Sequence, residues 1–270
     1  MLPLSRMPRP LAASIRGVFA DIDDTITSDG RLGAAAYAAV EALAVAGLDV
    51  IPVTGRPAGW CDHIARMWPV TAVVGENGAF YFRYEHAARR MHQRFMQDAA
   101  TRRAGRERLA ALAGQILAQV PGTALASDQA YREADLAIDW CEDVPALDAA
   151  AVARIVAAFH AAGANAKVSS IHVNGWFGDY DKLGMTRIAA RECLGVDLDL
   201  ARERYVFVGD SPNDAPLFGF FPNAVGVANV RAFAGQLDAE PRYVTGAASG
   251  DGFRELAMHL LAARGAREPS

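Results

Sequence analysis

Three aspartates lie within four positions, at Asp21, Asp23 and Asp24, directly after the apolar run Val18–Ala20. Carboxylates this close disfavour one another's ionisation unless a cation or an unusual environment offsets their charge. Asp21 and Asp23 share strand parity and so begin on one face of the chain, whereas Asp24 turns away. Such a pair suits metal-assisted chemistry, with one carboxylate as nucleophile and one as acid/base. The alternative is an Asp-rich turn that caps a helix.

A second acidic segment follows another apolar run, because Asp210 and Asp214 come just after Tyr205–Val208. If both runs are strands of one parallel sheet, their carboxyl ends share the edge at which open α/β sheets bind ligands. Asp210 and Asp214 then face Asp21 and Asp23, and four converging carboxylates are strongly unfavourable without a cation. Carboxylate oxygens suit Mg²⁺, which commonly bridges them to phosphate oxygens. The spacing therefore predicts a Mg²⁺ site.

Groups that suit a phosphate follow the same pattern. Thr54 and Gly55 come after the apolar run Leu48–Val53 and offer a hydroxyl and an approachable backbone N–H. Lys182 begins a predicted helix over residues 182–194, which would direct a cation to the same edge. Each feature alone is most often a turn or a solvated side chain. Their ordered recurrence at strand ends favours an anion site.

The elements that position these residues alternate along both ends of the chain. Helices are expected at 31–46, 60–68 and 182–194, and strands at 18–22, 48–53, 71–74, 205–208, 224–227 and 242–244. This βαβ order predicts an α/β fold with a doubly wound parallel sheet. Pro52 is an irregularity, because a proline inside a strand removes one hydrogen bond from the ladder.

The middle of the chain breaks this order. Helices are expected at 98–120 and 146–162, and strand-like segments at 123–127, 135–140 and 167–173. We expect residues 1–84 and 177–270 to form the catalytic core and residues 85–176 an inserted α+β domain with its own small core; two sequential domains are the alternative. Within the insertion, the candidates to face the site are Arg132, Glu133, His172, Asn174 and Trp176. Ordinary packing is the simpler explanation for each.

Composition narrows the class of protein. The chain has 270 residues, of which 52% are hydrophobic, and a net charge of -4, which argues against a general nucleic-acid binder. No apolar run approaches the roughly 20 residues that span a bilayer, and residues 1–16 lack the apolar segment of a signal peptide. Three widely separated cysteines without CxxC spacing favour reduced thiols and a cytoplasmic location. The oligomeric state is not indicated.

The motifs together resemble those of the haloacid dehalogenase (HAD) superfamily. Asp21-x-Asp23-x-Thr25 is similar to its first motif, Thr54 in Val-Thr-Gly-Arg to the second, Lys182 to the third, and residues 209–214 to the fourth. The insertion lies between the second and third motifs, as type-two caps do. Its αββαββ-like pattern, near Thr-Gly-Arg and Glu-Asn-Gly, resembles the Cof-like and sucrose-phosphate phosphatase-like branch of subfamily IIB. Asp24 departs from the pattern, since many members have Gly there.

The resemblance implies a role for each motif residue. Asp21 is the expected nucleophile, which forms an aspartyl-phosphate, and Asp23 the expected acid/base. The Asp21 and Asp210 carboxylates and the backbone carbonyl of Asp23 are expected to hold Mg²⁺, with Asp214 binding or orienting that shell. The residues expected at the phosphate or substrate are Thr54, Gly55, Arg56, Asn77, Lys182 and Asn213.

The implied activity is Mg²⁺-dependent hydrolysis of a phosphomonoester, with a small phosphorylated metabolite, above all a sugar phosphate, as substrate. A phosphomutase of the same family is the nearest alternative, because an aspartyl-phosphate can return its phosphoryl group to another hydroxyl. A phospho-accepting signalling domain is disfavoured, because there the paired acids and the phospho-acceptor lie on different strands. A catalytically silent binding protein is also disfavoured, because every motif residue needed for chemistry is present.

Overall fold

Six parallel strands form the main sheet of this computed structural model, which describes residues 1–265. Their order is β1-β13-β12-β11-β2-β3, and their bounds are β1 Leu2–Pro3, β2 Gly17–Ala20, β3 Asp49–Pro52, β11 Tyr205–Gly209, β12 Val225–Gly226 and β13 Tyr243–Val244. The chain goes from β2 to β3 on one side and from β11 through β12 to β13 on the other, so the switch point lies between β2 and β11. The predicted doubly wound parallel sheet is confirmed.

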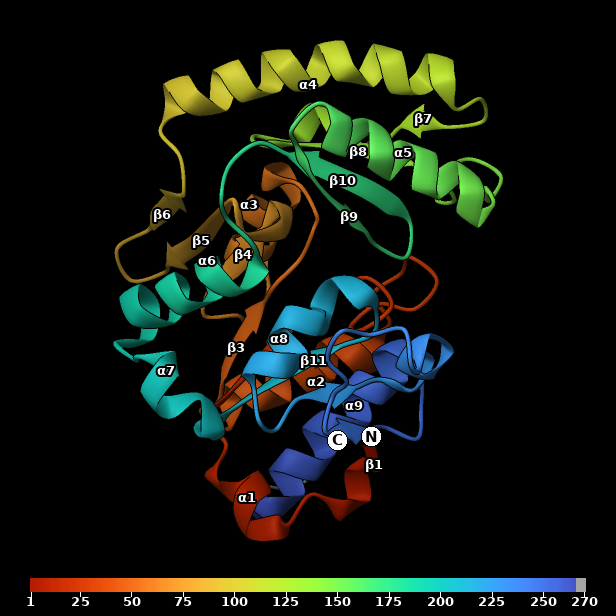
Figure 1. Cartoon of the computed structure of the whole chain (residues 1–270). Coiled ribbons are helices and arrows are strands. Elements are labelled where there is room, and N and C mark those ends of the chain that lie inside the picture. The colour runs from red at the N-terminus through yellow and green to blue at the C-terminus, as the bar shows by residue number, and fades with distance from the viewer. Residues whose placement is uncertain (266–270) are drawn as a thin grey trace.

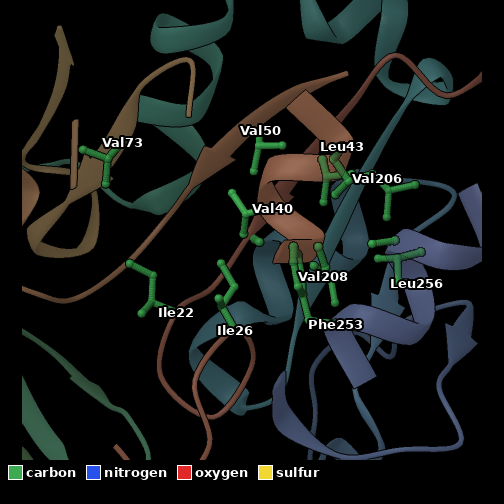
Figure 2. Packing of buried hydrophobic residues seen from close by; sticks show 14 of the residues in the cluster. Ile22, Ile26, Val40, Leu43, Val50, Val73, Val206, Val208, Phe253 and Leu256 are labelled. Carbon is green, nitrogen blue, oxygen red and sulfur yellow. The ribbon is translucent and has the colours of Figure 1, made fainter. Parts of the chain in front are cut away.

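Helices cover both faces of this sheet (Figure 1). One face packs against α1 (Arg9–Ser14), α2 (Ala34–Val45) and α9 (Ser249–Ala263), and the other against α6 (Lys182–Ala189), α7 (Leu198–Ala201) and α8 (Ala215–Phe220). Strand alternation produces this arrangement, since Val18 and Ala20 of β2 belong to the first cluster and Phe19 between them to the second. Figure 2 shows residues of the first cluster, among them Leu43 of α2, Phe253 of α9 and Val208 of β11.

A small antiparallel sheet extends the main one. It consists of β4 (Val73–Gly75), β5 (Phe80–Glu85) and β6 (Arg90–Phe95), with α3 (Ala58–Met67) packed beside it, and a bridge between Val53 and Val74 joins it to β3. The hairpin β5–β6 was not predicted. Its turn places Arg89 at a φ of 52°, a conformation that Gly or Asn normally signals, so the sequence carries no turn signature there.

Pro52 lies on β3, the last strand of the main sheet, and the position of its missing N–H faces away from β2, towards β4. The next residue, Val53, donates its N–H to the carbonyl of Ala20 on β2. Successive N–H groups of a strand alternate in direction, so the position of Pro52 faces the side without a β2 partner.

The inserted region forms an antiparallel sheet of order β7-β8-β10-β9, and α4 (Ala99–Gln119) and α5 (Ala149–Ala161) lie on its outer side (Figure 1). The strands are β7 Ala124–Leu125, β8 Asp135–Asp139, β9 Asn165–Val168 and β10 His172–Trp176. It has its own apolar cluster, which includes Ile116 of α4 and Phe159 of α5. We call this α+β unit the cap. The boundaries 85–176 stay a prediction, and Phe95 of β6 packs with the first core cluster.

The single strand predicted over 167–173 is wrong. The chain turns there, and Ser169 accepts the backbone N–H of His172 at 3.0 Å through its hydroxyl, so two strands, β9 and β10, pair with each other. The helix predicted over 182–194 continues past α6 only as one π-helical turn, Ala190–Leu194. Among residues 1–265, no helix is long and apolar enough to cross a membrane.

Candidate active site

Lys182 joins two buried aspartates at the switch point of the sheet. Its Nζ lies 2.8 Å from Oδ1 of Asp21, directly after β2, and 2.9 Å from Oδ1 of Asp214. All three side chains are at most 7% exposed. Burial raises the pKa of Asp21 to about 8, against the lowering effect of the Lys182 ammonium. The two carboxylates raise the pKa of Lys182, so the lysine stays charged. The expected convergence of the first, third and fourth motifs is therefore present.

Asp210 completes a group of three carboxylates. Oxygens of Asp21, Asp210 and Asp214 all lie within 4.8 Å of one another and are buried. Asp214 uses both oxygens, one for Lys182 and the other for the backbone N–H of Asp210 at 3.1 Å. Burial and the neighbouring Asp21 raise the pKa of Asp210 well above its ordinary value. One lysine cannot neutralise three buried carboxylates, so the donor set fits a hard divalent cation such as Mg²⁺.

The Asp23 carboxylate is held by Arg56 instead. Arg56 Nε lies 3.0 Å from both oxygens of Asp23, and Nη2 lies 2.8 Å from Oδ1. The guanidinium also stacks on Trp60, with Cζ 4.4 Å from the ring centre. This bidentate pairing orients Asp23 and leaves its backbone carbonyl as the group expected at the cation.

The second motif lies beside Asn77. Thr54 is completely buried and its hydroxyl accepts the backbone N–H of Arg56 at 3.0 Å. A Cβ on Gly55 would stand 3.3 Å from the Asn77 amide, a tight contact, so the glycine leaves the backbone accessible beside that amide. The buried Nδ2 of Asn77 has no hydrogen-bond partner, which leaves it free for a ligand oxygen. On the fourth motif, Asn213 accepts the Ser211 hydroxyl at 2.8 Å.

The cap closes over these residues. A cavity of about 10 Å³ lies between the two parts, the room that one water needs. Asp21, Asp23, Gly55, Arg56, Ser211 and Asn213 line its core side, and Ser169, Ser170, Ile171, His172 and Asn174 its cap side. The turn between β9 and β10 thus reaches the loops that follow β2, β3 and β11, and a ligand larger than a water cannot enter without displacing it.

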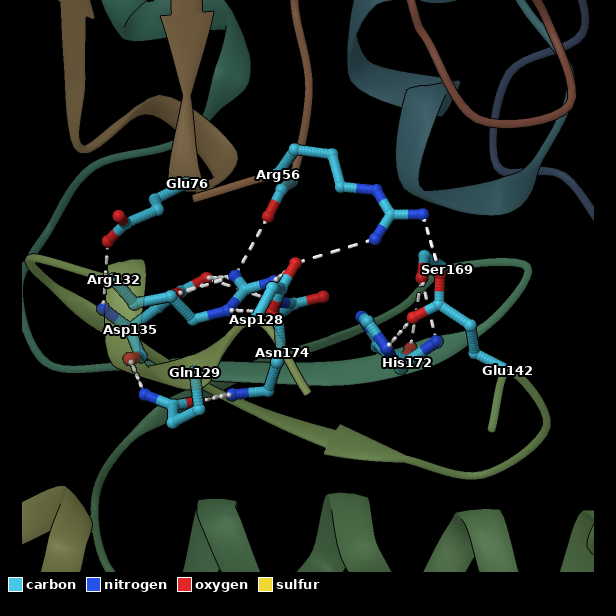
Figure 3. A network of polar contacts seen from close by, with 12 residues as sticks. Arg56, Glu76, Asp128, Gln129, Arg132, Asp135, Glu142, Ser169, His172 and Asn174 are labelled. Atoms are coloured by element: carbon cyan, nitrogen blue, oxygen red, sulfur yellow. Dashed lines mark hydrogen bonds and ion pairs between the residues drawn. The ribbon is translucent and has the colours of Figure 1, made fainter. Parts of the chain in front are cut away.

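A buried polar network joins the cap to the core (Figure 3). Glu76, completely buried on the core, accepts backbone N–H groups from Ala58 and from three consecutive cap residues, 133–135. Arg132 pairs with Asp128 and Asp135 and donates to the carbonyl of Gly55 at 2.9 Å. The cap is therefore held on the core by ionic contacts and by hydrogen bonds to backbone groups.

The five cap candidates have different positions. His172 and Asn174 line the cavity, and Arg132 lies in the buried network beside it. Glu133 pairs with Arg106 at the surface of the cap, and Trp176 stacks on Tyr180, so both have packing roles.

Asp128 and Glu142 were not expected at the site, although both contact Arg56. Glu142 shares the signal that identified the core residues, since it is an acidic residue that follows a predicted strand. That signal was applied to the parallel sheet alone.

No protein-family model and no curated protein matches this chain. Among solved structures, a sucrose-phosphatase from Synechocystis, solved with sucrose and phosphate, is 14% identical with a TM-score of 0.62 and covers 91% of this chain and 98% of that chain. A putative HAD/Cof-like hydrolase from Plasmodium vivax is 15% identical with a TM-score of 0.65, over 94% of this chain and 99% of that chain.

A third structure is a HAD subclass IIB sugar phosphatase, which is 14% identical with a TM-score of 0.60 over 92% of this chain and 99% of that chain. Identities of this size show the fold alone. The fold that the motifs predicted by resemblance is therefore confirmed. The chain has the fold of the haloacid dehalogenase superfamily, a parallel α/β core with an additional cap, as found in Cof-like and subclass IIB members.

Proposed function

We propose that this protein hydrolyses phosphomonoesters with Asp21 as the nucleophile. The observation that carries the proposal is the buried group in which Lys182 joins Asp21 and Asp214 beside Asp210. A carboxylate held against a lysine, at the carboxyl edge of a parallel sheet, can attack an electrophile while the lysine and a cation attract its anionic oxygens.

The residues divide the reaction into two displacements. An oxygen of Asp21 attacks phosphorus and the ester P–O bond breaks, while Asp23 gives its proton to the leaving oxygen. Asp23 then takes a proton from a water whose oxygen attacks the phosphorus of the aspartyl-phosphate, and the bond to Asp21 breaks to release phosphate. Lys182, Thr54 and the Gly55 N–H stabilise the equatorial oxygens, with Arg56, Asn77 and Asn213 at the substrate. Mg²⁺, held by Asp21, Asp210 and the Asp23 carbonyl with Asp214 in support, would neutralise charge on the phosphoryl group.

We propose a small phosphorylated metabolite, a sugar phosphate, as the substrate. Two similar structures are a sucrose-phosphatase and a sugar phosphatase. The cap side of the cavity carries hydroxyl, amide and imidazole groups from Ser169, Ser170, Asn174 and His172, which suit a polyhydroxyl leaving group. A cytoplasmic location is part of the proposal, supported by the three unpaired cysteines.

The test is phosphate release from a panel of sugar, polyol and nucleotide phosphates, with Mg²⁺ and with a chelator. Asp21→Asn should lower kcat at least about a thousandfold. Asp24→Asn is the matched control, because a φ of 56° at this position is one that Asn adopts readily, and it should keep activity within about threefold. Unchanged phosphate release by Asp21→Asn would contradict the proposal. Transfer of phosphate to a second hydroxyl without release would favour a mutase.

A further inference from the structure

Glu142 lies on a cap loop whose conformation is fixed by hydrogen bonds to Asp139. The buried carboxylate of Asp139, the last residue of β8, accepts the backbone N–H of Cys141 at 2.9 Å, of Glu142 at 2.8 Å and of Asp143 at 2.8 Å. Three charge-assisted hydrogen bonds to consecutive residues hold the loop in one conformation. The loop therefore presents Glu142 at a defined place.

Both oxygens of Glu142 have partners on opposite sides. Oε1 lies 2.8 Å from Nη2 of Arg56, a core residue, and Oε2 lies 2.8 Å from Nε2 of His172 on β10 (Figure 3). Glu142 thus joins the cap sheet to the core through Arg56 and His172, two residues that line the cavity.

The same nitrogen of Arg56 reaches the acid/base. Nη2 lies 2.8 Å from Oδ1 of Asp23 as well as 2.8 Å from Oε1 of Glu142. A guanidinium is planar and its N–H directions are fixed, and Trp60 stacks on its face. Glu142 of the cap therefore fixes the orientation of the guanidinium. The guanidinium in turn fixes the plane of the Asp23 carboxylate.

We propose that Glu142 is a positioning residue, which acts through Arg56 to orient the Asp23 carboxylate when the cap is closed. This inference rests on the proposed function. It assigns to a cap residue the coupling between cap closure and proton transfer, since opening the cap withdraws Glu142 and frees the guanidinium to rotate away from its position over Asp23.

The inference predicts a loss that depends on the leaving group. An alkyl or sugar phosphate leaves as a strongly basic alkoxide and needs the proton of Asp23. A p-nitrophenolate leaves without one, so general-acid assistance matters much less. A residue that only stabilises the cap would affect both esters alike.

The experiment compares kcat for glucose 6-phosphate, or the best sugar phosphate of the panel, with kcat for p-nitrophenyl phosphate. Glu142→Ala should lower kcat about tenfold or more for the sugar phosphate and less than about threefold for the aryl phosphate. Glu142→Gln keeps an acceptor for Arg56 but loses the charge, so its ratio should be intermediate. Glu85→Ala is the control, because it breaks another glutamate–histidine pair, Glu85–His92, on the β5–β6 hairpin.

An unchanged ratio of the two kcat values in folded Glu142→Ala would overturn the inference, as would a change confined to KM. If Glu142→Ala does not fold, the ratio in Glu142→Gln decides in the same way. Failure of the proposed function gives a different result, in which the native protein hydrolyses neither ester, and the inference then falls with it.

Discussion

Lys182 carries the charge balance at the residue scale, because three buried carboxylates surround one ammonium group. Replacing Lys182 with Met should lower the free energy of unfolding by about 3 kcal/mol, since it leaves Asp21 and Asp214 buried without a cation. Mg²⁺ should restore part of this loss, because a bound divalent ion supplies the missing positive charge. Urea unfolding with Mg²⁺ and with a chelator measures both effects.

Lys167→Met is the matched control, because Lys167 is exposed on β9. It should leave both stability and the response to Mg²⁺ close to native. This account of the charges is contradicted if Lys182→Met is no less stable than Lys167→Met. It is also contradicted if Mg²⁺ stabilises Lys182→Met no more than it stabilises the native protein.

The pH dependence of stability tests Glu142. The close contact with His172, whose Nε2 lies 2.8 Å from Oε2, together with Arg56, lowers the pKa of Glu142 from 4.5 to about 2. A carboxyl group whose pKa is lower in the folded state stabilises the fold above pH 4.5, and this contribution is lost as the pH falls towards 2. Glu142→Gln should therefore flatten the acid loss of stability between pH 4.5 and 2. The group is partly exposed, so the difference is on the order of 1 kcal/mol or less.

Denaturant unfolding across that pH range gives the measurement. A variant slope equal to the native slope would show that Glu142 has no such coupling in solution. Glu85→Gln should keep the native slope, because an exposed pair contributes little.

The residues that we propose at the active site could be predicted where one signal applied, an acidic or polar group directly after an apolar strand. Asp21, Asp210 and Asp214 were found this way and meet around Lys182. The four N–H donors of Glu76 could not be predicted, because three of them come from backbone groups more than fifty positions later. No side-chain pattern marks a backbone donor.

At the scale of elements, the start of α6 depends on one glycine. Gly78 has a φ of 102°, and a Cβ there would overlap the carbonyl oxygen of Asp181 and stand 2.8 Å from the backbone nitrogen of Lys182. Gly78→Ala should push the first turn of α6 away, lower the free energy of unfolding by at least about 2 kcal/mol and reduce phosphate release, because Lys182 leaves Asp21.

Gly105→Ala on α4 is the contrasting variant, because its added Cβ would have no atom within 4 Å apart from its chain neighbours and the backbone of its own helix. It should raise the free energy of unfolding by about 0.5 to 1 kcal/mol, as alanine does in helix interiors, and leave activity unchanged. Thermal unfolding and phosphate release compare the two variants. A Gly78→Ala protein with native stability and activity would refute the role given to this contact.

Helices and strands, like the site residues, could be predicted only where the sequence carries a side-chain signal. Where an apolar run marks an element of the core, its range was predicted within a few residues, as for α2 and β11, whereas no range was predicted for β1, α1, α8 or α9. The hairpin β5–β6 and the turn between β9 and β10 were missed. Their turns use Arg89 and Ser169, whose roles come from backbone conformation and a local hydroxyl bond, not from a Gly or Pro.

At the scale of the whole molecule, Glu76 holds the cap on the core. Glu76→Gln replaces one acceptor oxygen by an NH₂ group that faces N–H donors, so some of its four bonds must break. Backbone amides 133–135 should then exchange hydrogen at least about tenfold faster, while those of β11, in the middle of the main sheet, keep their protection. Hydrogen exchange followed by mass spectrometry makes this comparison. Uniform acceleration, or none, would show that Glu76 does not act as a local hold on the cap.

The closed cap also bears on access. With room for about one water between the parts, a substrate of the proposed size can reach Asp21 only when the cap or its β9–β10 turn moves. The sequence indicated an insertion and the acidic strand ends of the core. It did not indicate how closely the cap is bound, because that depends on contacts such as Arg132 with the Gly55 carbonyl, between segments far apart in the chain.

Detection of a phosphoryl group on Asp21 tests the central claim most directly. The native protein is mixed with Mg²⁺ and a turned-over substrate and quenched in acid within one turnover, and the peptide that contains Asp21 is analysed by mass spectrometry. The account predicts the added mass of one phosphoryl group on Asp21 in the native protein and none on the same peptide of Asp21→Asn. Turnover by the native protein with no phosphoryl group on Asp21 at any quench time, or with the group on another residue, would contradict it.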